Sequence, residues 1–168
     1  MAALSLINRL LETEKEGKVL VTTGTLTSAK LMAERLPDRA CHQFTPIDRP
    51  KFVKRFFKHW KPNLMLVMES EFWPIQIEAA KQFGIRIIAV NSRLSENSFS
   101  RWRTASFLSP TIFQSLDLVL ATNKQQGDRF ARLGAKNVIV SGNLKRSAPR
   151  LMVDLKIAQN LSEQIANR

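Results

Sequence analysis

Several residue types that commonly build functional sites are scarce in this chain of 168 residues. Cys41 is the single cysteine, which excludes an internal disulfide and a cysteine-based metal site. We expect Cys41 to be a small buried side chain. His42 and His59 are the two histidines, so a histidine-rich metal centre is also excluded. We therefore expect no metal and no cofactor.

Long apolar runs and glycine-rich loops are missing as well. No run reaches the roughly 18 apolar residues that a membrane span needs. Residues 1–11 lack the basic leader and the cleavage site of a signal peptide, so we expect a cytoplasmic chain. The motifs G-x-G-x-x-G, G-x-x-x-x-G-K-[ST] and G-x-S-x-G do not occur. Their absence removes the main support for a dinucleotide-binding protein, a P-loop NTPase or an α/β-hydrolase.

Acidic residues are few beside the basic ones, 14 against 26, which gives a formal net charge of +12. This charge indicates a polyanionic partner: nucleic acid, a phospholipid surface or a phosphorylated substrate. The densest basic cluster is residues 49–61, where a helix would place aromatic and aliphatic side chains on one face and basic side chains on the other. Such a helix either packs on a sheet with a solvated basic face, or lies on anionic lipid.

The pattern along the chain predicts alternating strands and helices, with apolar β-rich runs at a spacing of roughly 20 to 25 residues. This is typical of a doubly wound α/β fold with a parallel sheet. The predicted strands are 18–22, 40–44, 64–68, 85–90, 117–121 and 137–141. The predicted helices are 29–36, 50–60, 75–83 and 124–133, with helical spacing also in 99–113, broken at Pro110. Gly84 and Gly134 are placed to end helices.

Two carboxylates follow the strand predicted at residues 64–68. This strand is wholly apolar, which predicts burial on both faces, and Glu69 and Glu71 come directly after it. Pro74 suits the first turn of the next helix. In open α/β sheets, ligands bind beyond the carboxyl ends of the strands, which is where both carboxylates fall. Alternatively, one of them complements the positive end of the following helix.

Two other strands are predicted to bring cationic side chains to the same edge. Arg93 follows the strand that ends near residue 90, and Lys145 follows the last strand. Arg93 could hold a phosphate or a carboxylate, or could pair with Glu69 or Glu71. We expect Glu69, Arg93 and Lys145 to converge in one cleft.

A hydroxyl-rich turn follows the first predicted strand, at residues 22–28. Free backbone N–H groups and hydroxyls at a helix N-terminus can bind an anion. Serine and threonine are also the usual N-cap residues, and capping is the interpretation we favour. Thr23 and Thr25 are therefore candidate substrate-binding residues with an alternative role in the fold.

Three strings in this order carry a resemblance to a known family: E-S-E-F-W-P at 69–74, N-S-R-L-S-E-N-S at 91–98 and G-N-L-K at 142–145. Together they resemble the 3-deoxy-D-manno-octulosonic acid (Kdo) transferases of lipopolysaccharide synthesis. Residues 21–27 and 44–50 are similar to further segments of that family. The resemblance covers about residues 1–145.

The resemblance implies the Rossmann-like N-terminal half of a two-domain GT-B glycosyltransferase. Such an enzyme takes CMP-Kdo as donor and a phosphorylated lipid A precursor as acceptor, and works peripherally on the cytoplasmic face of the inner membrane, an anionic surface. Residues 1–148 would be its acceptor-binding domain. Because the sequence opens in mid-helix without a cap, we expect this domain to lack its first strand. Residues 149–168 would be a helical linker toward an absent C-terminal domain, which binds the donor.

The resemblance also implies roles for site residues. Glu69 and Lys145 would be catalytic, stabilising the transition state. From their positions at strand ends and in the hydroxyl-rich turn, rather than from the resemblance, we expect Glu71, Arg93, Thr23 and Thr25 to bind substrate. The family's general base is a glutamate in an S-V-G-E turn that would precede Met1, so we expect the 168 residues alone to be inactive. The family usually has an aromatic residue and Asp after the G-x-L-K lysine, where this chain has Arg146 and Ser147.

Two alternative functions remain open at this point. One is another GT-B glycosyltransferase or sugar-nucleotide enzyme. The other, from a different class, is a basic α/β domain that binds nucleic acid, for which the aromatic and basic residues at 52–60 are the specific support. We expect no nucleic-acid partner, and salt-sensitive binding of RNA or DNA without binding of anionic lipid would reverse this expectation.

Overall fold

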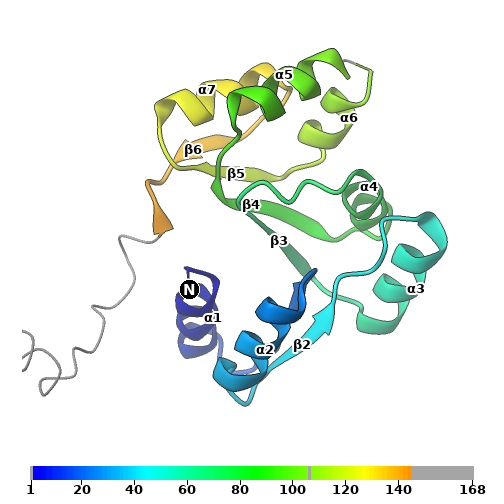
Figure 1. The fold of residues 1–168 in the computed structure, drawn as a ribbon, viewed down its shortest axis with the longest axis vertical. Coiled ribbons are helices and arrows are strands. Elements are labelled where there is room, and N and C mark those ends of the chain that lie inside the picture. The colour runs from blue at the N-terminus through cyan, green and yellow to red at the C-terminus, as the bar shows by residue number, and fades with distance from the viewer. Residues whose placement is uncertain (1, 106, 145–168) are drawn as a thin grey trace, which may run out of the picture.

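The computed structural model describes residues 2–105 and 107–144. In this part of the chain, helices and strands alternate except that α5 is followed directly by α6, and every strand pair is parallel (Figure 1). This confirms the predicted α/β fold with parallel sheets. The helices are α1 (Ala2–Thr13), α2 (Leu26–Arg35), α3 (Pro50–Trp60), α4 (Pro74–Gln82), α5 (Glu96–Thr104), α6 (Ser109–Gln114) and α7 (Lys124–Arg132). The strands are β1 (Val19–Thr23), β2 (Ala40–Phe44), β3 (Leu64–Met68), β4 (Arg86–Ser92), β5 (Leu118–Ala121) and β6 (Val138–Val140).

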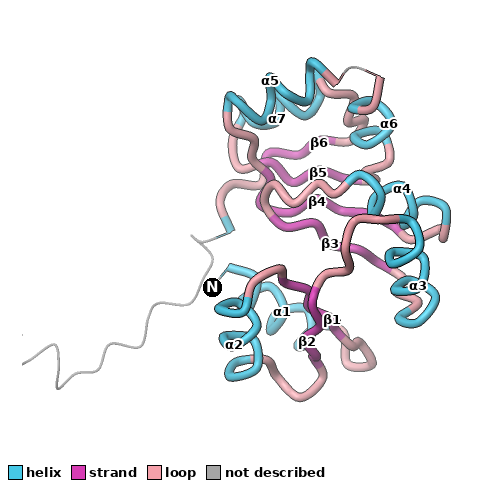
Figure 2. Tube along the Cα trace, turned by 45° about the vertical axis from the view of Figure 1, so that its right-hand side comes forward, coloured by secondary structure: helices cyan, strands magenta, loops and turns pink. Residues whose placement is uncertain are grey.

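The strands form two separate sheets among the described residues (Figure 2). One pairs β1 with β2, and the other has the order β3-β4-β5-β6. In the larger sheet, Met68 at the end of β3 stands beside Val90 of β4. The residues that follow β3 and β4 therefore leave the sheet at the same edge.

The prediction that the strand at residues 64–68 is buried on both faces is wrong. The wholly apolar strand β3 is not buried on both faces: within it only Val67 is buried, and Leu64 is 42% exposed. The physical reason is that β3 lies at an edge of its sheet and has a strand on one side only. The prediction of a buried Cys41 is wrong for a similar reason, since Cys41 is exposed on β2 of the two-stranded sheet.

The main hydrophobic core joins the larger sheet to helices α3, α4, α5, α6 and α7. Phe72, Phe113 and Phe130 contact one another, with ring centroids 5.4 to 5.8 Å apart. Ile77 of α4 and Ile87 of β4 are fully buried in the same cluster. Phe72 precedes α4 by two residues, so the core directly anchors the segment that connects β3 to α4.

Local sequence signals determine where several helices begin and end. Thr25 is the N-cap of α2, where its side chain accepts a hydrogen bond from the Ser28 N–H at 3.2 Å, as the capping interpretation predicts. Gly84 and Gly134 follow α4 and α7 with left-handed φ angles of 70° and 107°. The segment 99–113 contains the end of α5 and most of α6, and Pro110 lies in the first turn of α6.

Candidate functional site

Glu69 and Arg93 meet at the carboxyl edge of the larger sheet. Glu69 follows β3, Arg93 follows β4, and Arg93 Nη2 donates a hydrogen bond to Glu69 Oε2 at 2.9 Å. The two side chains are 38% and 54% exposed. An ion pair this exposed stabilises a fold by about 1 kcal/mol at most, so a ligand can take the place of either partner. The structure thus brings these two predicted site residues together at one edge, while a shared cleft and their role in binding stay predictions.

The backbone at this edge is left-handed at two residues that are not glycine. Glu69 has φ 55° and Asn91, at the end of β4, has φ 53°. The Glu69 N–H donates to the Val90 carbonyl oxygen at 2.9 Å, which locks the two strand ends together. Such conformations cost about 1 to 3 kcal/mol each and persist where the surroundings enforce them, which is common at functional sites.

Asn91 is a site residue whose role the sequence analysis missed. Its side chain is buried, and its Oδ1 accepts a hydrogen bond from the Leu144 N–H at 3.1 Å. This bond ties the segment after β6 to the end of β4. The catalytic candidate Lys145 comes next in the chain but lies outside the described residues, so its place in the cleft stays a prediction. Asparagine is enriched among left-handed non-glycine residues, and its position directly after an apolar run was the available signal.

The loop that carries Arg93 is fixed from two sides. On one side, the Ser70 hydroxyl donates to the Arg93 carbonyl oxygen. On the other side, α7 holds Leu94: the Leu94 N–H donates to Gln126 Oε1 at 2.6 Å, and the Arg129 guanidinium donates to the Leu94 carbonyl oxygen. Arg93 is thus presented on a backbone that is already positioned before a ligand binds.

Two further carboxylates near this edge, those of Glu71 and Asp48, accept hydrogen bonds from different partners. Glu71 is exposed, and its Oε2 accepts a hydrogen bond from the Trp73 Nε1–H at 3.0 Å. The carboxylate that accepts from the first turn of α4 is Asp48, which bonds the N–H groups of Ile75 and Gln76 at 3.2 and 2.9 Å. Asp48 therefore complements the positive end of α4, the role suggested as an alternative for Glu69 or Glu71.

Thr23 and Thr25 lie at the end of β1, in the smaller sheet and its following turn. Thr23 Oγ1 is hydrogen-bonded to His42 Nε2 at 2.8 Å, and Thr25 caps α2. Substrate binding by these two residues stays a prediction. In the part of the chain that the structure describes, no three His, Cys, Asp or Glu side chains are grouped so that they could hold a metal ion.

This edge offers two complementary groups to a ligand. A carboxylate accepts hydrogen bonds from sugar hydroxyls and stabilises positive charge, while a guanidinium binds a phosphate or a carboxylate through two parallel N–H groups. Both arise from the ends of neighbouring strands, which are rigid elements. The site is therefore suited to a ligand that carries hydroxyls and an anionic group.

Comparison with known proteins identifies the family. The profile of the 3-deoxy-D-manno-octulosonic-acid transferase (kdotransferase) family matches residues 1–148. The chain belongs to this family. Glu69, Asn91 and Arg93 all lie within the matched residues, as does Lys145. Membership in this family argues against the nucleic-acid-binding alternative.

Individual members of the Kdo transferase family are similar along the whole chain or most of it. The 3-deoxy-D-manno-octulosonic acid transferase of Rickettsia felis is 35% identical over all of this chain and 36% of its own length. The Rickettsia bellii enzyme of that name is 36% identical over all of this chain and 40% of its length. The one from Haemophilus influenzae is 29% identical over 86% of this chain and 34% of its length. The chain thus spans well under half of the length of these relatives.

Proposed function

We propose that this chain is the acceptor-binding domain of a longer enzyme that transfers Kdo from CMP-Kdo to a phosphorylated lipid A precursor. The observation that carries the proposal is the exposed Glu69–Arg93 pair at the carboxyl edge of the sheet, inside the part of the chain that matches the Kdo transferase family. In open α/β sheets this edge is where ligands bind.

Each candidate residue has a role that its chemistry supports. The Glu69 carboxylate would stabilise the positive charge that develops at the anomeric centre of the donor sugar. Arg93 would hold an anionic group of the substrate, and Lys145 would neutralise the leaving phosphate. Glu71, Thr23 and Thr25 would contribute hydrogen bonds to substrate. The proton of the attacking acceptor hydroxyl needs a general base, which the family supplies from an S-V-G-E turn.

We further propose that residues 1–148 belong to one Rossmann-like domain of a GT-B enzyme, in which a further strand joins the two sheets. The division of the parallel strands into two sheets supports this, because one more strand between β1 and β3 would join them. The half-exposed apolar side chains of β3 also favour a further neighbour for that strand. Residues 149–168 would then lead to the donor-binding domain.

A transfer assay tests this function. The longer protein, incubated with radiolabelled CMP-Kdo and a phosphorylated lipid A precursor, is expected to give labelled lipid. The 168 residues alone are expected to give none, because they span only 36 to 40% of the length of the Rickettsia relatives and transfer needs every reacting group positioned together. Turnover by the isolated 168 residues would contradict the proposal that transfer requires the longer protein. Labelling by other sugar nucleotides in preference to CMP-Kdo would contradict the proposed donor.

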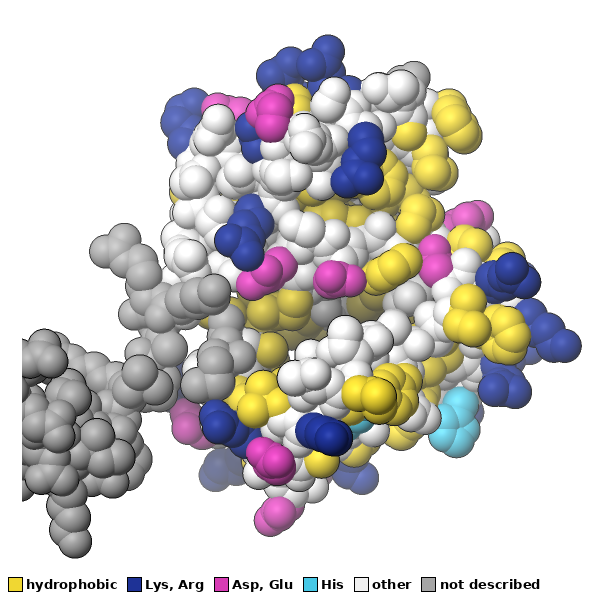
Figure 3. Space-filling model, viewed as in Figure 1, with side chains coloured by type: hydrophobic (Ala, Val, Ile, Leu, Met, Phe, Trp, Pro, Cys, Tyr) yellow, Lys and Arg dark blue, Asp and Glu magenta, His cyan; other side chains and the backbone are white. Residues whose placement is uncertain are grey.

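The surface of α3 is the part of the chain that we propose attaches it peripherally to the cytoplasmic face of the inner membrane. Val53 and Phe57 are buried, and Phe57 contacts Phe83 just after α4, which confirms that α3 packs against the domain. Four exposed basic side chains form the outer surface, here called the α3 basic face: Lys51, Lys54, Arg55 and Lys58. Phe52 belongs to the same helix and is 38% exposed. Figure 3 shows Lys and Arg side chains next to hydrophobic ones on the side of the molecule where α3 lies. The described residues include no helix that is long and apolar enough to cross a membrane.

Removing the α3 basic face is expected to abolish most binding to anionic vesicles at low salt. Each basic residue near an anionic surface contributes about 1 kcal/mol, so changing Lys51, Lys54, Arg55 and Lys58 to Gln removes roughly 4 kcal/mol of attraction. Liposome sedimentation measures the effect. The matched control changes four exposed lysines elsewhere to Gln, namely Lys15, Lys18, Lys30 and Lys136. Equal losses in both variants would show a general charge effect, and unchanged binding would leave α3 as a packing element.

A further inference from the structure

Three guanidinium groups gather around one buried phenyl ring on the α5–α7 side of the molecule. The Phe99 side chain in α5 is 3% exposed. The guanidinium carbons of Arg103, Arg129 and Arg132 lie 5.8, 5.5 and 5.2 Å from its ring centroid. Each contact is a favourable cation–π interaction, but the three like charges repel one another.

The charge of one of these arginines is balanced by a carboxylate, while the other two have no such partner in the part of the chain that the structure describes. Arg129 pairs with Glu96 and donates to the Leu94 carbonyl oxygen. Arg103 and Arg132 form no ion pair with any carboxylate among the described residues. Both side chains are exposed, so their N–H groups are accessible to a ligand.

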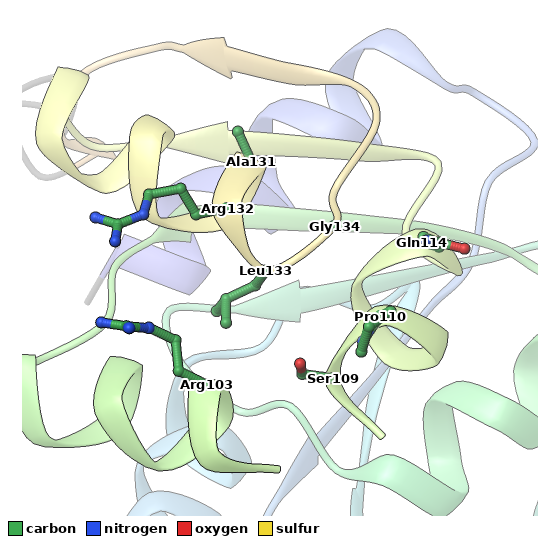
Figure 4. Close-up of a pocket in the computed structure, with 8 residues that line it drawn as sticks. All are labelled: Arg103, Ser109, Pro110, Gln114, Ala131, Arg132, Leu133 and Gly134. Atoms are coloured by element: carbon green, nitrogen blue, oxygen red, sulfur yellow. The ribbon is translucent and has the colours of Figure 1, made fainter. Parts of the chain in front are cut away.

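These two arginines border the same hollow. It has a volume of about 390 Å³ and is also lined by Ser109, Gln114 and Gly134. Figure 4 shows both side chains extending to the same side of the hollow from their separate helices. Arg103 is in the last turn of α5 and Arg132 in the last turn of α7. In a parallel α/β unit, helices end at the amino edge of the sheet, so this hollow and the Glu69–Arg93 pair lie at opposite edges.

We propose that Arg103 and Arg132 form a second anion site, which binds a phosphate group. A phosphate carries close to two negative charges at neutral pH, which matches two guanidinium groups, and its oxygens fit the parallel N–H donors of arginine. Basic residues are common in last helical turns because they complement the helix dipole. These two differ from that ordinary case because they converge on one ring and one hollow.

Titration with inorganic phosphate tests the site. The 168-residue chain carrying Arg93→Gln is used throughout, so that the Glu69–Arg93 pair does not contribute. Backbone amide NMR signals of residues 99–103 and 129–134 are expected to shift saturably with phosphate and not with chloride at equal ionic strength. Hydrogen bonds to charged groups are worth about 1.5 to 3 kcal/mol, so Arg103→Gln and Arg132→Gln should each weaken binding at least about tenfold.

Two matched variants make the test specific. Arg101→Gln removes another exposed arginine of the last turn of α5, one that is not among the three whose guanidinium groups lie over Phe99 in the described structure. It is expected to leave phosphate affinity within about twofold. Arg132→Lys keeps the positive charge but loses the parallel N–H donors of the guanidinium. This variant should bind phosphate with intermediate affinity. Absence of saturable shifts, or equal weakening by Arg101→Gln, would overturn the proposal.

Vesicles identify the source of the phosphate. Retention on phosphatidic acid vesicles, but not on phosphatidylcholine alone, that depends on Arg103 and Arg132 would assign the site to a lipid headgroup. Saturable phosphate binding without such retention would assign it to a soluble phosphate. Both outcomes uphold the anion site. Neither depends on Kdo transfer, so failure of the function proposed above would leave this result unchanged.

Discussion

Changing Glu69 to Gln in the longer enzyme is expected to lower kcat by about 10²- to 10³-fold, the usual effect of removing one preorganised electrostatic contact to a transition state. Glutamine keeps the size of the side chain and removes its charge. If Glu69 served only as the partner of Arg93, the change would cost about 1 kcal/mol of stability or less, because the pair is exposed. A rate measurement with radiolabelled CMP-Kdo, alongside urea unfolding, separates these two roles.

Lys145→Ala is expected to lower kcat to a similar extent, since the developing charge on the leaving phosphate would lose its cation. The matched control is Glu78→Gln, which removes an exposed carboxylate of α4 that bonds only Gln82 among the described residues. The control should retain the wild-type rate. Near-normal rates in both the Glu69 and Lys145 variants would place the chemistry on other residues.

The elements of the fold were predictable because their signals are local. Apolar runs of four to six residues, glycines after helices and the proline at the start of α4 each act within a few residues. The prediction of Glu69 and Arg93 as neighbours needed one more rule, that parallel strands end at a common edge. The observed ion pair between them follows from that rule and from the adjacency of β3 and β4.

The supporting residues of the site could not be predicted in this way. Asp48 bonds Gln76, Leu94 bonds Gln126, and Asn91 bonds Leu144, at sequence separations of 28, 32 and 53 residues. The local sequence does not determine which distant N–H group a side chain will accept a hydrogen bond from. The exposure of β3 and Cys41 was missed for a related reason, because the burial of a strand depends on which neighbours the sheet gives it.

Changing Phe113 to Ala is expected to lower the free energy of unfolding by about 3 to 5 kcal/mol, the usual cost of truncating a buried phenylalanine. Phe113 is fully buried and contacts Phe72, Trp102 and Phe130. A domain of this size is stable by about 5 to 15 kcal/mol, so the loss is a large share of the total. Urea unfolding followed by circular dichroism measures it.

The matched control is Phe107→Ala, which removes the same side chain at a position that is 85% exposed. Its effect should stay within about 0.5 kcal/mol. Equal effects of the two changes would contradict the packing described here. The Phe113 variant should also weaken substrate binding, because Phe72 directly follows the segment that carries Glu69 and is held in place by the Phe113 ring. A milder change, Phe113→Leu, should lower stability less and show whether the two effects decline together, as expected if the aromatic core positions Glu69.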